Sequence, residues 1–105
     1  MKSQYDVFAR IHFYPSVAGG RNGTTATSFF GCPLEFEGEK FDCRLLLEEI
    51  GPVSPGQTVG VPIAFLYPEL VKPRLSAGSR FTLWEMRTIA EGIVERVVPD
   101  QLKDF

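Results

Sequence analysis

The sequence is poor in the residues that most often build metal sites and catalytic centres. It contains one histidine, His12, and two cysteines, Cys32 and Cys43, which do not form a Cys-x-x-Cys pair. Transition metals are held mainly by clusters of cysteine and histidine, so no metal site is expected. His12 has no serine or cysteine beside it in a motif typical of a nucleophile. We therefore predict no cofactor and no catalytic residues, with His12 as a surface or interface histidine.

The two cysteines leave two interpretations open. A disulfide between Cys32 and Cys43 would close a short loop, but nothing in the sequence points to an oxidising compartment. The alternative is that Cys43 is a small core residue and Cys32 lies at the end of a strand.

The chain also lacks an excess of one charge and a long apolar run. Eleven Lys and Arg residues against 13 Asp and Glu give a net charge of −2, so no general attraction to nucleic acid or to an anionic membrane is expected. No apolar run approaches the roughly 20 residues that span a membrane. The N-terminal Met-Lys-Ser-Gln-Tyr-Asp is no apolar signal region, and no Gly-x-x-x-x-Gly-Lys-Ser/Thr loop is present. We expect a cytoplasmic protein without a membrane or nucleotide partner.

The sequence does contain a series of alternating segments separated by turns. Ten glycines and eight prolines favour many turns and disfavour long helices. Apolar and polar residues alternate over Tyr5–Tyr14, Leu34–Leu47, Gln57–Leu66 and Arg80–Val98. The last segment predicts a hairpin around Glu85–Thr88. With 105 residues, the chain is predicted to be one all-β domain, a small barrel from about 5 to 98 with a short polar tail at 99–105.

The alternation assigns side chains to the core or to the surface. In the first segment the predicted core side is Tyr5, Val7, Ala9, Ile11 and Phe13, and the outer side is Asp6, Phe8, Arg10, His12 and Tyr14. Aromatic and charged groups on one outer face are typical of an interaction surface, although a half-covered strand fits equally well. Trp84 lies opposite the core pair Phe81 and Leu83. It either joins a contact surface, where tryptophan is enriched, or packs under the segment 67–74.

Other segments are less regular. Leu45–Ile50 has some helical character, but the Gly-Pro pair that follows would end a helix within two turns. Pro62 predicts a strand edge or a bulge, because proline cannot donate a ladder hydrogen bond. Tyr67–Ser79 predicts an excursion over the surface. Ala90 and Gly92 are small, as a crowded barrel interior requires.

Taken in order, several short motifs resemble the C-terminal β-barrel domain (domain III) of bacterial elongation factor Tu. They are Gly19-Gly20-Arg21, Phe29-Phe30-Gly31 with Pro33, Pro55-Gly56-Gln57-Thr58-Val59, Pro73 with Gly78-Ser79-Arg80-Phe81, and Arg87-Thr88-Ile89 with Gly92-Ile93-Val94. Their order and spacing extend the resemblance from about Tyr5 to Val98. The resemblance implies a closed six-stranded antiparallel barrel, here as a stand-alone domain.

In the intact elongation factor this barrel helps to bind the T-arm of aminoacyl-tRNA and contacts the exchange factor. By resemblance, Arg21 would contact a phosphate through two hydrogen bonds. The sequence departs from the family where RNA would be approached. Asn22 replaces a histidine, Leu34 replaces a glutamine, and Glu85 with Met86 replaces a Gly-Gly pair. Glu85 adds negative charge there, which argues against tRNA binding.

Two groups of charged residues also allow alternatives. Glu35, Glu37 and Glu39 would either form a cation-binding cluster or lie on a solvated hairpin face, and the second is favoured because Glu39 is expected in or after the turn. The arginines that would form an anion-binding face, if they gathered at one end of the barrel, are Arg10, Arg21, Arg74, Arg80 and Arg87. Scattered surface charge is favoured.

Together these patterns favour a non-catalytic binding module with a protein partner and, from the resemblance, a role related to translation. The candidate partner- or anion-binding residues are Arg21, Asn22, Arg10 and Arg87. The candidate interface aromatics are Phe8, Tyr14 and Trp84. One alternative is a tRNA-binding module, and another is a small enzyme that uses Cys32, Cys43 or His12.

Overall fold

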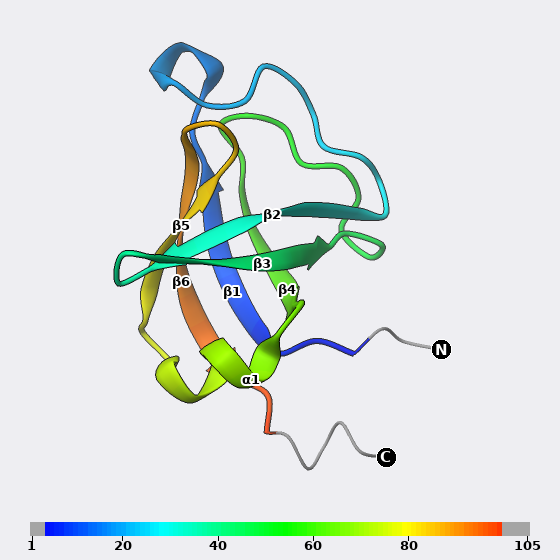
Figure 1. The fold of residues 1–105 in the computed structure, drawn as a ribbon. Coiled ribbons are helices and arrows are strands. Elements are labelled where there is room, and N and C mark those ends of the chain that lie inside the picture. The colour runs from blue at the N-terminus through cyan, green and yellow to red at the C-terminus, as the bar shows by residue number, and fades with distance from the viewer. Residues whose placement is uncertain (1–3, 100–105) are drawn as a thin grey trace.

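The computed structural model describes residues 4–99, in which six antiparallel strands form a closed barrel (Figure 1). The strands are β1 (Val7–Phe13), β2 (Phe29–Phe36), β3 (Glu39–Leu46), β4 (Thr58–Phe65), β5 (Arg80–Trp84) and β6 (Thr88–Val97). Their order around the barrel is β1-β4-β3-β2-β5-β6, and β6 pairs with β1. Each strand therefore has a neighbour on both sides, so closure protects its edges. The prediction of a closed six-stranded barrel is confirmed. Most of the predicted tail, residues 100–105, lies outside the described part.

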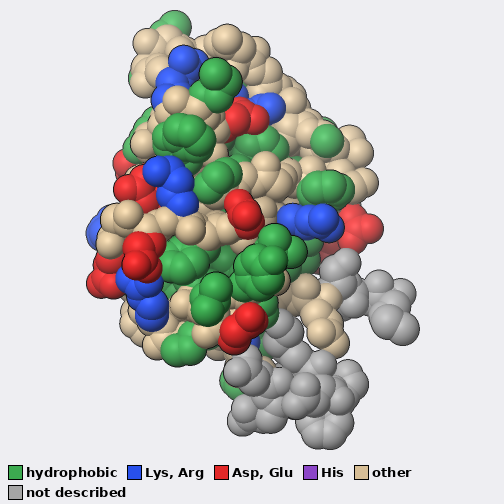
Figure 2. All heavy atoms as spheres, viewed as in Figure 1, with side chains coloured by type: hydrophobic (Ala, Val, Ile, Leu, Met, Phe, Trp, Pro, Cys, Tyr) green, Lys and Arg blue, Asp and Glu red, His purple; other side chains and the backbone are tan. Residues whose placement is uncertain are grey.

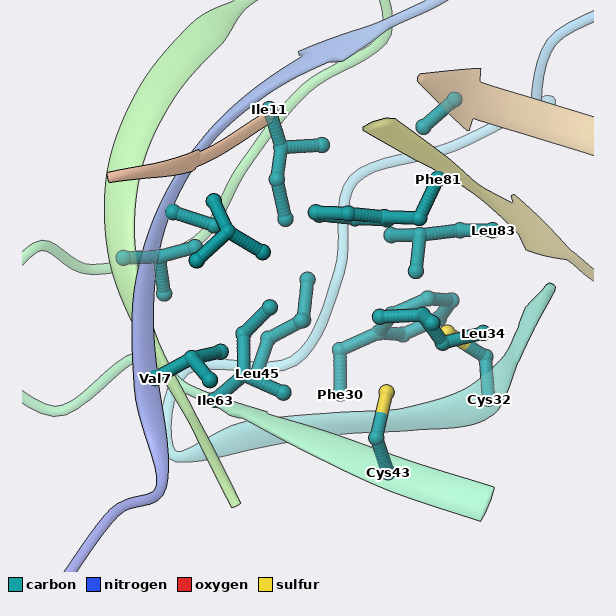
Figure 3. Packing of buried hydrophobic residues seen from close by; sticks show 14 of the residues in the cluster. Val7, Ile11, Phe30, Cys32, Leu34, Cys43, Leu45, Ile63, Phe81 and Leu83 are labelled. Atoms are coloured by element: carbon teal, nitrogen blue, oxygen red, sulfur yellow. The ribbon is translucent and has the colours of Figure 1, made fainter. Parts of the chain in front are cut away.

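The core consists of the inward side chains that the alternation predicts. Val7, Ala9, Ile11 and Phe13 of β1 are at most 2% exposed. Figure 3 shows side chains from β1 to β5 pointing toward one another across the barrel. Tyr5, which was predicted to be in the core, precedes the strand and is only half-buried.

The hairpin of β5 and β6 contains a bulge that sequence alternation alone does not show. The register shifts between Leu83, which faces Ala90, and Trp84, which faces Thr88. One extra residue on β6 lets both Ile89 and Ala90 point inward, and both are at most 1% exposed. Farther along β6, a Cβ atom on Gly92 would lie 2.4 Å from the Phe81 ring, so this position needs the absence of a side chain.

The turn between β2 and β3 is a two-residue reversal. Only Glu37 and Gly38 form it, with φ angles of 53° and 83°. Two consecutive positive φ angles are typical of a type I′ hairpin. Glu39 and Lys40 begin β3 and pair with Phe36 and Glu35, so Glu39 lies directly after the turn.

The structure explains two irregular features of the sequence, Pro62 and the segment Leu45–Ile50. The ladder between β3 and β4 covers only Ile63 to Phe65, so Pro62 has β1 alone beside it, as predicted for a local edge. Leu45 and Leu46 belong to β3, and residues 47–50 form no helix. None of the described helices is long and apolar enough to span a membrane.

The segment after β4 closes the barrel at the end where both termini lie (Figure 1). It forms α1 (Pro68–Val71) and the 3-10 helix η2 (Lys72–Arg74). The prediction of a surface excursion is only half right, because Val71 and Leu75 are 0% and 7% exposed. These two side chains turn the segment into a plug for the barrel interior.

A second prediction, that Asp6 lies on the outer face, is wrong at the same end of the barrel. The alternation placed it on the outer face, yet it is 1% exposed. Its carboxylate accepts a hydrogen bond from the Phe65 N–H (2.8 Å) and lies 3.8 Å from the ammonium of Lys72, which is also buried. The alternation failed here because β1 begins only at Val7, and strand periodicity does not constrain the residue before it.

Candidate functional site

The loop end of the barrel, residues 15–24 and 85–87, brings together most of the predicted binding residues. It lies opposite the two termini, where the loop containing the 3-10 helix η1 (Ser16–Ala18) meets the β5–β6 turn (Figure 1). Arg21, Asn22 and Arg87 all belong to this end. Arg10, the fourth candidate, lies on the barrel wall in β1.

Arg21 fixes the first loop to the turn. Its Nε donates to the Glu85 carboxylate (2.8 Å) and its Nη1 donates to the Gly23 carbonyl (2.8 Å). The guanidinium also lies 4.7 Å from the centre of the Phe30 ring, a cation–π contact. The side chain is only 21% exposed. Two nitrogens of the Arg21 guanidinium therefore already donate hydrogen bonds within the protein, and Glu85 neutralises its charge.

Arg87 makes a second link between the same segments. Its Nε and Nη2 donate to the carbonyl oxygens of Gly19 (2.6 Å) and Gly20 (2.9 Å). Gly20 must be glycine for this geometry, because a Cβ atom there would lie 2.0 Å from the Tyr14 carbonyl oxygen. Asn22 is exposed on the same loop. The two arginines thus rigidify the loop end.

This cross-linked end displays two apolar side chains that the alternation of the sequence does not single out. Val17 is 98% exposed and Met86 is 89% exposed. Met86 has a φ angle of 65°, which is uncommon for a residue other than glycine. The signal in the sequence was Glu85 with Met86 at the place where the elongation factor Tu barrel, which the sequence resembles, has a Gly-Gly pair. Exposed apolar groups held on a rigid support are suited to contact another protein.

The three predicted interface aromatics are half-buried and each has a neighbour in the barrel wall. The Arg96 guanidinium lies 4.7 Å from the centre of the Phe8 ring, and the Lys40 ammonium lies 5.1 Å from that of Trp84. Tyr14 donates to the Glu91 carboxylate (3.1 Å). Burial and this hydrogen bond raise the pKa of Tyr14, so the phenol stays neutral and acts as a donor.

A groove of about 680 Å³ on the outer wall has Arg10, His12, Arg80 and Glu91 in its lining and none of the three aromatics. Arg10 pairs with Glu95 (3.2 Å), and Nδ1 of His12 lies 2.9 Å from the Thr58 hydroxyl. No carboxylate hydrogen-bonds to the His12 ring among the described residues, so His12 and Thr58 do not form part of a triad.

The cysteines occupy the core. Cys32 and Cys43 face each other across β2 and β3, and both are free and buried (Figure 3). The prediction that Cys32 lies at a strand end is wrong, because β2 continues to Phe36. A hydrogen bond with Cys32, together with burial, raises the pKa of the Cys43 thiol well above its ordinary value. A protonated, inaccessible thiol is a poor nucleophile.

Two of the three glutamates considered as a cation-binding cluster pair with one arginine. Arg74 binds both Glu39 and Glu37, and the separation from Glu37 is 3.0 Å. The five arginines considered together do not gather at one end, because Arg10 and Arg80 line the wall groove. Within residues 4–99 no group of histidine, cysteine, aspartate and glutamate side chains is arranged to hold a metal ion.

Comparison with known proteins assigns no family. No family model matches the chain, and no curated protein shows a significant match.

Proposed function

We propose that this protein is a non-catalytic module that binds another protein through the loop end. The observation that carries the proposal is the pair of nearly fully exposed apolar side chains, Val17 and Met86, on two loops that Arg21 and Arg87 hold together. Association with a partner would cost little loop entropy, because the loops are already linked in the free protein. The resemblance to the elongation factor Tu barrel supports a partner in translation.

The bonding of the two arginines favours a protein partner over tRNA. Sequence-independent RNA affinity comes from arginine and lysine side chains that neutralise phosphates. Here Arg21 is paired with Glu85, and two N–H groups of Arg87 are engaged by backbone carbonyls. The formal charge of these three side chains is only +1, so their electrostatic attraction to RNA phosphates is weak.

The test is affinity capture from cell extract with three proteins: the wild type, a Val17→Ser/Met86→Ser variant, and an Ile50→Ser control. Ile50 is an exposed apolar residue outside the loop end, 41% exposed. We expect a protein that the wild type and the control enrich and the double variant loses. For the purified pair, the dissociation constant should rise at least about tenfold in the double variant, as for hot-spot residues.

Two outcomes would contradict the proposal. One is a partner that all three proteins capture equally. The other is tRNA binding at low salt that weakens as salt rises, with a salt dependence that Arg21→Ala reduces. The second outcome would support the RNA-binding alternative.

A further inference from the structure

The outer face of β2, β3 and β4 carries a shallow groove of about 570 Å³. Strand register creates it, because Gly31, Arg44 and Ala64 lie in one row across the three strands. Pro33 lies opposite Asp42 in the next row. The small side chains of β2 and β4 leave a hollow on either side of β3, and Arg44 and Asp42 are the charged groups in the lining.

The two charged groups have unused bonding capacity. They are two residues apart on the same face of β3, so about 6.6 Å separates their backbone positions. Neither makes a hydrogen bond or an ion pair through its side chain with another residue in the described range 4–99. The Arg44 guanidinium lies 4.8 Å from the centre of the Phe29 ring, which orients it along the face.

Exposed apolar side chains border the groove. Phe29 is 46% exposed on β2, and Leu66 is 60% exposed on the opposite side. Tyr67 and Leu70 continue the apolar border onto α1 and are 57% and 59% exposed. Figure 2 shows hydrophobic side chains in the middle of this face, between β3 and α1, with single charged side chains among them and a mixed cluster of both charges at the left. Apolar groups that follow one another along a face, beside a groove, indicate an interaction surface more strongly than scattered ones.

The charge pattern selects the occupant. One acid and one base stand side by side, so an acidic peptide would leave Asp42 unpaired and a basic one would leave Arg44 unpaired. A second copy of the chain satisfies both groups. A two-fold axis makes residue i of one subunit meet residue j of the other, and j meet i. With the axis between Asp42 and Arg44, two identical ion pairs form at the centre of the apolar face.

We propose that the chain forms a two-fold symmetric dimer through the outer face of β2, β3 and β4, in which Arg44 of each copy pairs with Asp42 of the other. The border residues Phe29 and Leu66 then exclude water from the two ion pairs. The loop end takes no part in this contact, so the dimer and the proposed protein-binding function stand or fall separately.

The test is sedimentation equilibrium of the full chain over a wide concentration range, with Asp42→Arg, Arg44→Asp and the double charge swap. We expect a concentration-dependent dimer for the wild type. Each single variant should dimerise at least about tenfold more weakly, because two like charges then meet across the axis. The double swap restores both ion pairs and should dimerise within a few-fold of the wild type.

A mixing experiment sharpens the test. An equimolar mixture of Asp42→Arg and Arg44→Asp proteins should form a heterodimer, since one copy then carries only bases and the other only acids at the axis. Arg80→Asp, on the wall of β5, is the matched control and should leave the wild-type dimer unchanged. Circular dichroism establishes that each variant is folded.

Three results would overturn the proposal. The first is a wild-type protein that stays monomeric at every concentration. The second is a dimer that the single variants do not weaken. The third is a pair of weakened single variants that neither the double swap nor the mixture restores.

Discussion

The two ends of the barrel are closed by different means. At the loop end, Arg21 and Arg87 bind carbonyl oxygens and one carboxylate near the surface, and the loops present Val17 and Met86 to solvent. At the end with the termini, α1 and η2 bury Val71 and Leu75, and Asp6 and Lys72 lie close together out of solvent. The segment at the end with the termini buries Val71 and Leu75 and leaves Tyr67 and Leu70 exposed beside them, whereas at the loop end both Val17 and Met86 lie in solvent. Burial of the first pair stabilises the fold, and the exposed pair at the loop end adds little to stability.

The largest expected loss of stability follows a substitution at the end with the termini. Asp6→Ala should lower the free energy of unfolding by about 3 kcal/mol, because it removes an acceptor for Phe65 N–H and leaves the Lys72 charge buried without this carboxylate. Urea denaturation measures the change. A Asp6→Asn/Lys72→Met double variant, which removes both charges, should recover most of the loss. A loss below about 0.5 kcal/mol for Asp6→Ala, the size typical of a neutral surface substitution, would contradict a stabilising role for the buried Asp6 carboxylate.

A smaller effect is expected at the loop end. Gly20→Ala should cost about 2 kcal/mol, because the new methyl group would overlap the Tyr14 carbonyl and force the loop away. Gly23→Ala is the matched control, since its Cβ atom would meet nothing within 4 Å, and its stability should stay within about 0.5 kcal/mol of the wild type. Hydrogen exchange should report faster opening of residues 16–23 in Gly20→Ala alone. Equal behaviour of the two variants would argue against a tightly linked loop.

The smallest effect on the free energy of unfolding is expected at Cys43, in the core between the two ends of the barrel. The folded-state pKa of Cys43 is raised, so its thiol favours the folded state below about pH 9 and loses this contribution as pH rises further. The free energy of unfolding should therefore show no change from this group between pH 6 and pH 8. Iodoacetamide at pH 8 should label both cysteines in urea but neither in the native protein. Fast labelling of the native protein would revive the cysteine-dependent alternative.

The sequence predicted the barrel because alternation is a local property. The inward residues of β1 could be predicted from neighbouring positions. The existence of the β5–β6 hairpin could be predicted in the same way. The linked loop end was not predictable in this way, because Arg21 and Glu85 are 64 residues apart and meet only through the fold. The same limit applies to Asp6, whose burial depends on Phe65 and Lys72. The exposure of Val17 and Met86 also depends on where two loops end in space, which periodicity does not describe.

Closure of the barrel has a consequence for how the chain acquires its structure. Strand β1 pairs with β4 and β6, so the first strand finds its last neighbour only when residues 90–97 are present. Pairings between such distant segments form slowly, since a long loop must close before they gain any stability. During synthesis β1 therefore keeps one unpaired edge until β6 is available, and an unpaired strand edge is prone to non-native pairing in that interval.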